Sequence, residues 1–153
     1  MRGLNFRGLI KFWLPVVLWM ALIFLGSTDL MSAEHTSRFI TPFLRWLMPD
    51  ISTAAIAQVH FYVRKAAHLT EYAVLALLLL RALRPALDGF RSRATVTLIC
   101  AVLFAAVDEF HQSFVASRTA SFGDVSIDSL GAIVGLLICG MTYFVRSRRK
   151  LGQ

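Results

Sequence analysis

Seven ionisable or amide side chains interrupt three otherwise apolar segments of this chain. They are His68 and Glu71, then Asp108, Glu109 and Gln112, then Asp124 and Asp128. A charge inside an apolar segment costs about 2.5 kcal/mol or more on membrane-insertion scales, so such groups are kept mainly where they face a protein interior or a wet cavity. Two carboxylates close together in a low dielectric suit general acid–base chemistry, and their oxygens together with an imidazole suit a divalent cation. These residues are therefore candidates for a functional site.

The spacing of these residues predicts that they meet at one level. Within each segment they form pairs that stand three or four residues apart, which places the two members of each pair on one face of a helix. The depth of each group along its segment can be measured from the basic residue at the opposite end. The pairs are Glu71 and Arg81, Asp108 and Arg93, and Asp128 and Arg146. Separations of ten, fifteen and eighteen residues correspond to roughly 15, 22 and 27 Å along a helix. All three groups are thus expected in the same half of a bilayer.

Two roles are open to the set. The candidate catalytic residues are His68, Glu71, Asp108 and Glu109. The candidate binding residues are Gln112, Asp124 and Asp128, with Lys65 and Arg118 near the mouth of the site. In a catalytic site, Glu71 or Glu109 would be the general base and His68 a proton shuttle or metal ligand. The alternative is a purely structural network of salt bridges that ties the helix ends together.

The composition predicts one integral membrane domain over residues 1–153. The chain is 57% apolar, with a mean hydropathy of +0.64 and a formal charge of +7, which is too apolar for an ordinary soluble domain. We expect an all-α four-helix bundle with spans at about 9–26, 66–80, 94–114 and 126–145. A cleavable signal peptide is the alternative for the first, although its length favours a retained span. Gly131 and Gly135 have the small-xxx-small spacing of closely packed membrane helices.

An amphipathic segment is expected outside the membrane between the first two spans. Residues 38–48 interleave aromatic side chains with Arg38 and Arg45, which predicts a helix in the headgroup region with Pro42 near its first turn. It would serve as an interfacial anchor or as a lid over the site. Residues 52–61 are expected to form a separate short helix before the second span.

Basic residues orient the bundle, because Lys and Arg accumulate on cytoplasmic loops. Eleven of them lie in the amino terminus, the 81–93 loop and the carboxyl-terminal tail, against five in the remaining loops. Both termini are therefore expected in the cytoplasm, and the polar set faces outward. The positive charge fits contact with anionic lipid of the inner leaflet, and the sequence contains no recognisable nucleic-acid module.

Three stretches contain the candidate residues, namely RKAAHLTEY at 64–72, DEFHQSF at 108–114 and DVSIDSLG at 124–131. With Arg118 between the last two, their order and spacing resemble the VanZ-like family of small bacterial membrane proteins, typified by an accessory protein of teicoplanin resistance. The resemblance adds Tyr72 to the binding residues and marks Gly131 beside the others. Asp128 departs from the pattern, since an Asn is expected there in many relatives.

These observations lead to one leading function and two alternatives. We expect an inner-membrane protein of the cell envelope whose outward-facing polar pocket binds a lipid-linked wall precursor or another anionic envelope component. An effect on glycopeptide susceptibility is implied by the resemblance alone. The alternatives are an intramembrane hydrolase or transferase acting on a lipid-linked substrate, and a purely structural membrane protein. Membrane lipid, a lipid-linked precursor or a glycopeptide are the expected partners, and a divalent cation is the candidate cofactor.

Overall fold

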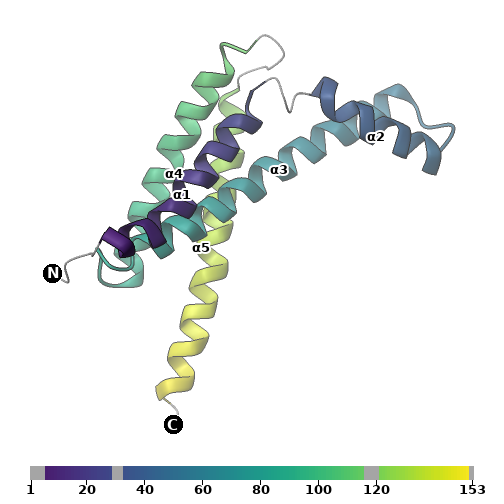
Figure 1. Cartoon of the computed structure of the whole chain (residues 1–153). Helices are drawn as coiled ribbons and strands as arrows, with labels where there is room; N and C mark the ends of the chain where they lie inside the picture. The colour runs from purple at the N-terminus through teal and green to yellow at the C-terminus, as the bar shows by residue number, and fades with distance from the viewer. Residues whose placement is uncertain (1–5, 29–32, 116–120, 152–153) are drawn as a thin grey trace.

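The computed structural model describes residues 6–28, 33–115 and 121–151, and within these ranges the chain is all-α (Figure 1). The helices are α1 (Phe6–Gly26), α2 (Ala33–Leu47), α3 (Thr53–Ala82), α4 (Phe90–Gln112) and α5 (Phe122–Leu151). Helix α3 is the centre of the fold, because it contacts each of the other four. Helix α5 packs against both α3 and α4.

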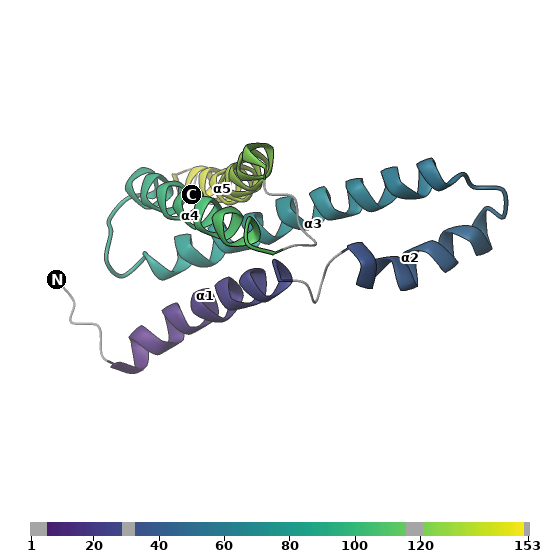
Figure 2. The same ribbon diagram turned by 90° about the horizontal axis from the view of Figure 1, so that it is seen from above.

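Helix α3 is longer than the segment expected to cross the membrane. Its 30 residues correspond to roughly 45 Å, and its amino-terminal half extends beyond the bundle, where α2 runs antiparallel beside it (Figures 1 and 2). The prediction of a separate helix at 52–61 is wrong. No proline or glycine interrupts residues 53–82, so a single helix runs from the Ser52 cap, whose hydroxyl accepts the Ala55 amide, to Ala82.

Helix α2 occupies the expected amphipathic segment but begins earlier than predicted. It starts at Ala33, so Pro42 lies well inside the helix rather than in its first turn. Phe39, Phe43 and Trp46 follow one another at helical spacing and are all exposed. The hydroxyl of Thr41 bonds the ring of His60 on α3 at 3.2 Å. One side of α2 is thus held on α3 while aromatic rings cover another.

Glycines set the distance between α3 and α5. A Cβ atom built on Gly131 would lie 3.0 Å from both the Cα and the carbonyl carbon of Leu69, and one on Gly135 would lie 2.5 Å from the carbonyl oxygen of Ala73. Carbon atoms normally keep about 3.5–4.0 Å apart. The predicted small-xxx-small packing within the bundle is confirmed, and only glycine fits at these positions without moving a helix.

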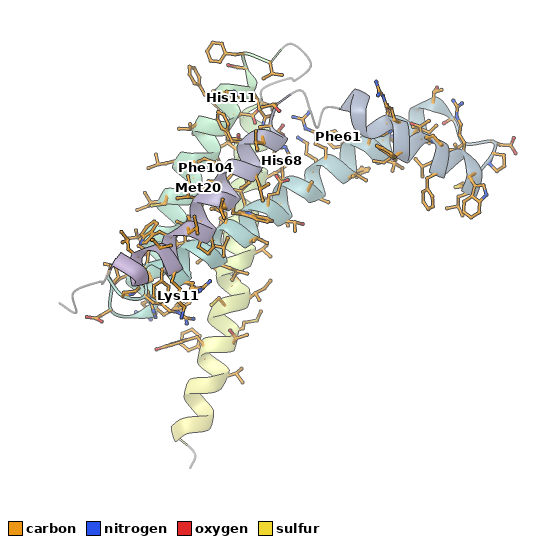
Figure 3. All side chains as sticks on the ribbon, in the orientation of Figure 1. Lys11, Met20, Phe61, His68, Phe104 and His111 are labelled. Atoms are coloured by element: carbon orange, nitrogen blue, oxygen red, sulfur yellow. The ribbon has the colours of Figure 1, made fainter. Side chains whose placement is uncertain are left out.

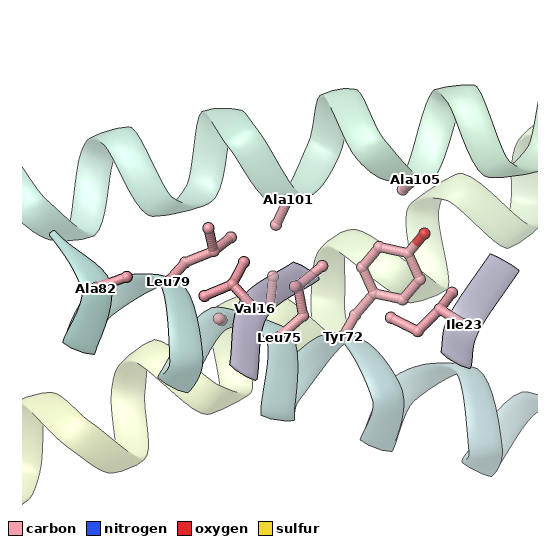
Figure 4. Packing of buried hydrophobic residues seen from close by; sticks show 10 residues of the cluster. Val16, Ile23, Tyr72, Leu75, Leu79, Ala82, Ala101 and Ala105 are labelled. Atoms are coloured by element: carbon pink, nitrogen blue, oxygen red, sulfur yellow. The ribbon is translucent and has the colours of Figure 1, made fainter. Parts of the chain in front are cut away.

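The apolar core lies between α1, α3, α4 and α5 (Figure 4). Its members are Val16, Ile23, Tyr72, Leu75, Ala76, Leu79, Ala82, Ala101, Ala105 and Ala132. Helices α4 and α5 contribute only alanines to this set, so their backbones approach α3 closely, as is typical of membrane bundles. The outer faces of the same helices expose large apolar side chains, including Leu103, Val107 and Leu137.

Three helices are long and apolar enough to cross a membrane, over Gly8–Gly26, Phe90–Gln112 and Phe122–Val145. They correspond to the expected spans at 9–26, 94–114 and 126–145. Helix α3, which contains the expected span at 66–80, is not among them. The chain is thus a membrane protein in which three helices of spanning character all contact α3.

Candidate functional site

A buried polar contact joins α3 to α5. Nδ1 of His68 lies 3.0 Å from Oδ1 of Asp128, and both side chains are buried. The contact is held at a fixed distance by the neighbouring glycine packing, because Leu69 follows His68 and Gly131 is one turn beyond Asp128. Figure 3 places His68 within the bundle, whereas Phe61 lies further out along α3.

A second buried network joins α1 to α4. The hydroxyl of Ser27 donates to Oδ2 of Asp108 at 2.7 Å, and Nε2 of Gln112 donates to the Ser27 hydroxyl at 3.0 Å and to the same Asp108 oxygen at 3.2 Å. All three side chains are buried. Their spacing follows from the helix, since Asp108 and Gln112 are one turn apart on α4. The end of α1 therefore closes one side of the site.

Two basic residues of α3 form the more exposed edge of the cluster. Arg64 donates through Nη2 to Oε1 of Gln112 at 3.2 Å and approaches Oδ2 of Asp124 at 3.7 Å, while Nζ of Lys65 bonds Oδ1 of Asp124. The side chains of Arg64 and Lys65 are 27% and 20% exposed, against 4% for Asp124. Asp124 thus already pairs with both cations of this edge.

The remaining carboxylates belong to the same cluster. One oxygen of Glu109 accepts the backbone amide of Ser121, which ties α4 to the segment that enters α5. Glu71 is half-buried one turn beyond His68, and its charge acts on the imidazole. The carbonyl oxygen of Glu71 accepts the indole N–H of Trp19 at 2.9 Å, which also fixes α1 on α3.

Tyr72 lies beneath these groups and is fully buried. Its ring packs 6.1 Å from that of Phe104, and its hydroxyl points toward α4 (Figure 4). The phenol is within electrostatic range of Asp108, Glu109 and Asp128. Among the described residues, no group forms a hydrogen bond with its hydroxyl.

Comparison with known proteins gives the chain a family. The model of the VanZ/LLP1 family matches residues 12–143. The chain belongs to the VanZ/LLP1 family. The match covers all of the polar cluster and most of the bundle, and it confirms the resemblance carried by residues 64–72, 108–114 and 124–131. The comparison with curated proteins and the comparison with solved structures gave no match.

In this VanZ/LLP1 protein, the helices bring together nine of the ten candidate residues. They are Lys65, His68, Glu71, Tyr72, Asp108, Glu109, Gln112, Asp124 and Asp128. The tenth, Arg118, lies outside the described residues. Sequence reasoning did not select Ser27 or Arg64, although Ser27 bonds Asp108 and Gln112 and Arg64 bonds Gln112. Arg64 stands four residues before His68 and so shares its face of α3, but the helices expected at 52–61 and 66–80 left Arg64 between them.

Three carboxylate oxygens of the cluster are buried without a hydrogen-bond partner among the described residues. They are Oδ1 of Asp108, Oε2 of Glu109 and Oδ2 of Asp128. The cluster also has more negative than positive groups: five carboxylates stand against Arg64, Lys65 and the titratable His68. In the part of the chain that the structure describes, no three His, Cys, Asp or Glu side chains are arranged to hold a metal ion. The cluster can therefore accept hydrogen bonds through its buried carboxylates, and it presents the cations Arg64 and Lys65 at its edge.

Proposed function

We propose that the protein is a multi-pass component of the bacterial cytoplasmic membrane that binds the polar headgroup of a lipid-linked or anionic envelope component from the outer side. In this arrangement α3 is a fourth crossing, and its charges face α1, α4 and α5 instead of lipid. Both termini lie in the cytoplasm, in keeping with the excess of basic residues in the tails and in the loop between α3 and α4. The cluster then sits in the outer half of the bilayer.

One observation carries the binding role. A network built only to staple helices would satisfy its own members, because an unpaired buried polar group costs about 1–3 kcal/mol. Here Asp108, Glu109, Asp128 and Tyr72 each keep a buried atom without a partner among the described residues. They belong to three different helices around one spot. Unused acceptors beside the partly exposed Arg64 and Lys65 suit a headgroup that brings both hydrogen-bond donors and negative charge.

The test compares phenotype with abundance in the native host. Asp108→Asn and Glu109→Gln keep size and remove charge, and Asp88→Asn is the matched control, because Asp88 is exposed in the turn between α3 and α4. The readout is susceptibility to a glycopeptide such as teicoplanin, beside the amount of protein in the membrane. We expect normal abundance and an altered susceptibility for the two cluster variants only. A phenotype that changes only in step with abundance would support the purely structural alternative.

A second candidate function is that of an intramembrane hydrolase or transferase acting on a lipid-linked substrate. The observation in its favour is the buried His68–Asp128 contact. A carboxylate on Nδ1 fixes the imidazole tautomer and leaves Nε2 to take a proton, as a general base requires. Turnover of a lipid-linked substrate by purified protein, abolished in Asp128→Ala and kept in Asp88→Asn, would favour the enzyme. Binding without turnover would favour the first function.

A further inference from the structure

The three unpaired carboxylate oxygens belong to one region of the molecule. Asp128 on α5 acts electrostatically on both Asp108 and Glu109 of α4, and the Tyr72 hydroxyl lies within electrostatic range of all three. Each acid already uses its other oxygen. Asp108 bonds Ser27 and Gln112, Glu109 bonds the Ser121 amide, and Asp128 bonds His68. The acids are thus each anchored through one oxygen, and their second oxygens are buried without a hydrogen-bond partner among the described residues.

The chemistry of these atoms selects the ligand group. Carboxylate oxygens accept hydrogen bonds and favour positive charge, and a primary ammonium supplies three N–H donors and one positive charge. Bonds from an ammonium are about 2.7–2.9 Å long, whereas Mg²⁺ needs oxygens at about 2.0–2.1 Å in near-ideal geometry. Buried carboxylate oxygens that lack a donor among the described residues therefore suit an ammonium group. The phenol oxygen of Tyr72 is a fourth acceptor.

The two cations at the edge of the cluster, Arg64 and Lys65, indicate that the ligand also carries a negative group. Arg64 and Lys65 are both more exposed than Asp124, which both of them approach. An approaching ligand meets them first. Guanidinium and ammonium groups bind phosphate oxygens through charge-assisted hydrogen bonds. A phosphate at this edge and an ammonium among the deeper acids would match the two charges of a single short headgroup.

We propose that the cluster recognises a membrane phospholipid whose phosphodiester carries a primary amine, the chemistry of phosphatidylethanolamine. The ammonium is held by Asp108, Glu109 and Asp128, and the phosphate by Arg64 and Lys65. This inference rests on the proposed headgroup-binding function and names the headgroup. It distinguishes primary from quaternary amines, because a trimethylammonium group has no N–H to donate.

The test is a lipid-binding comparison on the full-length protein. Purified protein in detergent is mixed with equal amounts of phosphatidylethanolamine, phosphatidylcholine or phosphatidylglycerol of identical acyl chains, and bound lipid is measured by native mass spectrometry. We expect phosphatidylethanolamine to bind about tenfold or more tightly than phosphatidylcholine, because two or three charge-assisted hydrogen bonds are lost with the latter. Since this comparison uses the wild-type chain, it does not depend on any variant folding.

Variants then test whether the lipid amine binds at the acids of the cluster. Asp108→Asn and Glu109→Gln should each reduce the preference for the primary amine, and Asp50→Asn, at an exposed position after α2, should leave it unchanged. If all three lipids bind equally and the cluster variants still weaken binding, the amine inference fails while headgroup binding stands. If the preference persists in both cluster variants, the amine is recognised elsewhere and the inference also fails. If no lipid binding responds to the cluster variants, both proposals fail.

Discussion

Gly131→Ala should separate α3 from α5 at the level of the polar cluster. The added Cβ would lie 3.0 Å from the Cα and carbonyl carbon of Leu69 and closer still to its carbonyl oxygen. These are backbone atoms of a helix, so no side chain can rotate away. Restoring an ordinary contact of about 3.5–4.0 Å requires the two helices to move apart by roughly 0.5–1 Å.

The magnitude follows from what that movement disturbs. Overpacking a tight interface typically costs about 1–3 kcal/mol, and the higher helix propensity of alanine returns about 0.5–1 kcal/mol. The separation would also stretch the 3.0 Å contact between His68 and Asp128, which lies one turn away. We therefore expect a net loss of about 1–2 kcal/mol, or a fall in Tm of roughly 2–8 °C for a chain of this size.

The assay is thermal unfolding of the purified protein in one detergent, followed by tryptophan fluorescence. Gly140→Ala is the matched control on the same helix, because its Cβ would meet only the ring of Phe90 at 3.3 Å, and a side chain can shift. Gly131→Ala should unfold clearly below Gly140→Ala. Equal unfolding temperatures for the two variants and the wild type would refute the close packing of α3 on α5.

Two further predictions concern the α1 contact and the orientation of the chain. Ser27→Ala removes the hydroxyl that donates to Asp108 at 2.7 Å, so the protein should lose about 1–3 kcal/mol of stability and its Tm should fall. Ser126→Ala is the control, because the exposed hydroxyl of Ser126 bonds only its own helix. An unchanged Tm for both variants would contradict the network. In a background with Cys100 and Cys139 replaced by alanine, Asp50→Cys should react with a membrane-impermeant maleimide on intact cells. Asp88→Cys should react only after permeabilisation, and the reverse pattern would invert the proposed topology.

Much of the helical arrangement could be predicted because apolar length is a local property. The apolar residues of α1, α4 and α5 form continuous runs, and the structure has helices in all three places. The common level of the acids was also accessible, since rise per residue converts sequence separation into depth. Spacing alone indicated that Asp108 and Gln112 share a face, and the structure joins them at 3.2 Å.

Pairing between helices could not be read from the chain in the same way. That Ser27 donates to Asp108 depends on where the end of α1 meets α4, 81 residues later in the sequence. Likewise, Arg64 could be assigned to an outer loop or to a helix, and only the unbroken α3 brings it beside Gln112 and Asp124. A helix was expected to begin at residue 52, close to the observed start at Thr53, but its continuation into the segment at 66–80 was missed because Arg64 and Lys65 interrupt the apolar residues there.

Most of the charged residues that keep α3 from qualifying as a spanning segment belong to the polar cluster. Judged alone, the helix contains Arg64, Lys65, Glu71 and Arg81 and does not qualify as a spanning segment. Within the bundle, however, its residues His68, Tyr72, Leu75, Ala76 and Leu79 are buried against neighbouring helices. Asp124 and Asp128 of α5 and Gln112 of α4 then pair with the groups that would be costly in lipid. A central helix can carry such charges because its neighbours replace the lipid, and this is the condition under which a buried polar site can exist in a membrane.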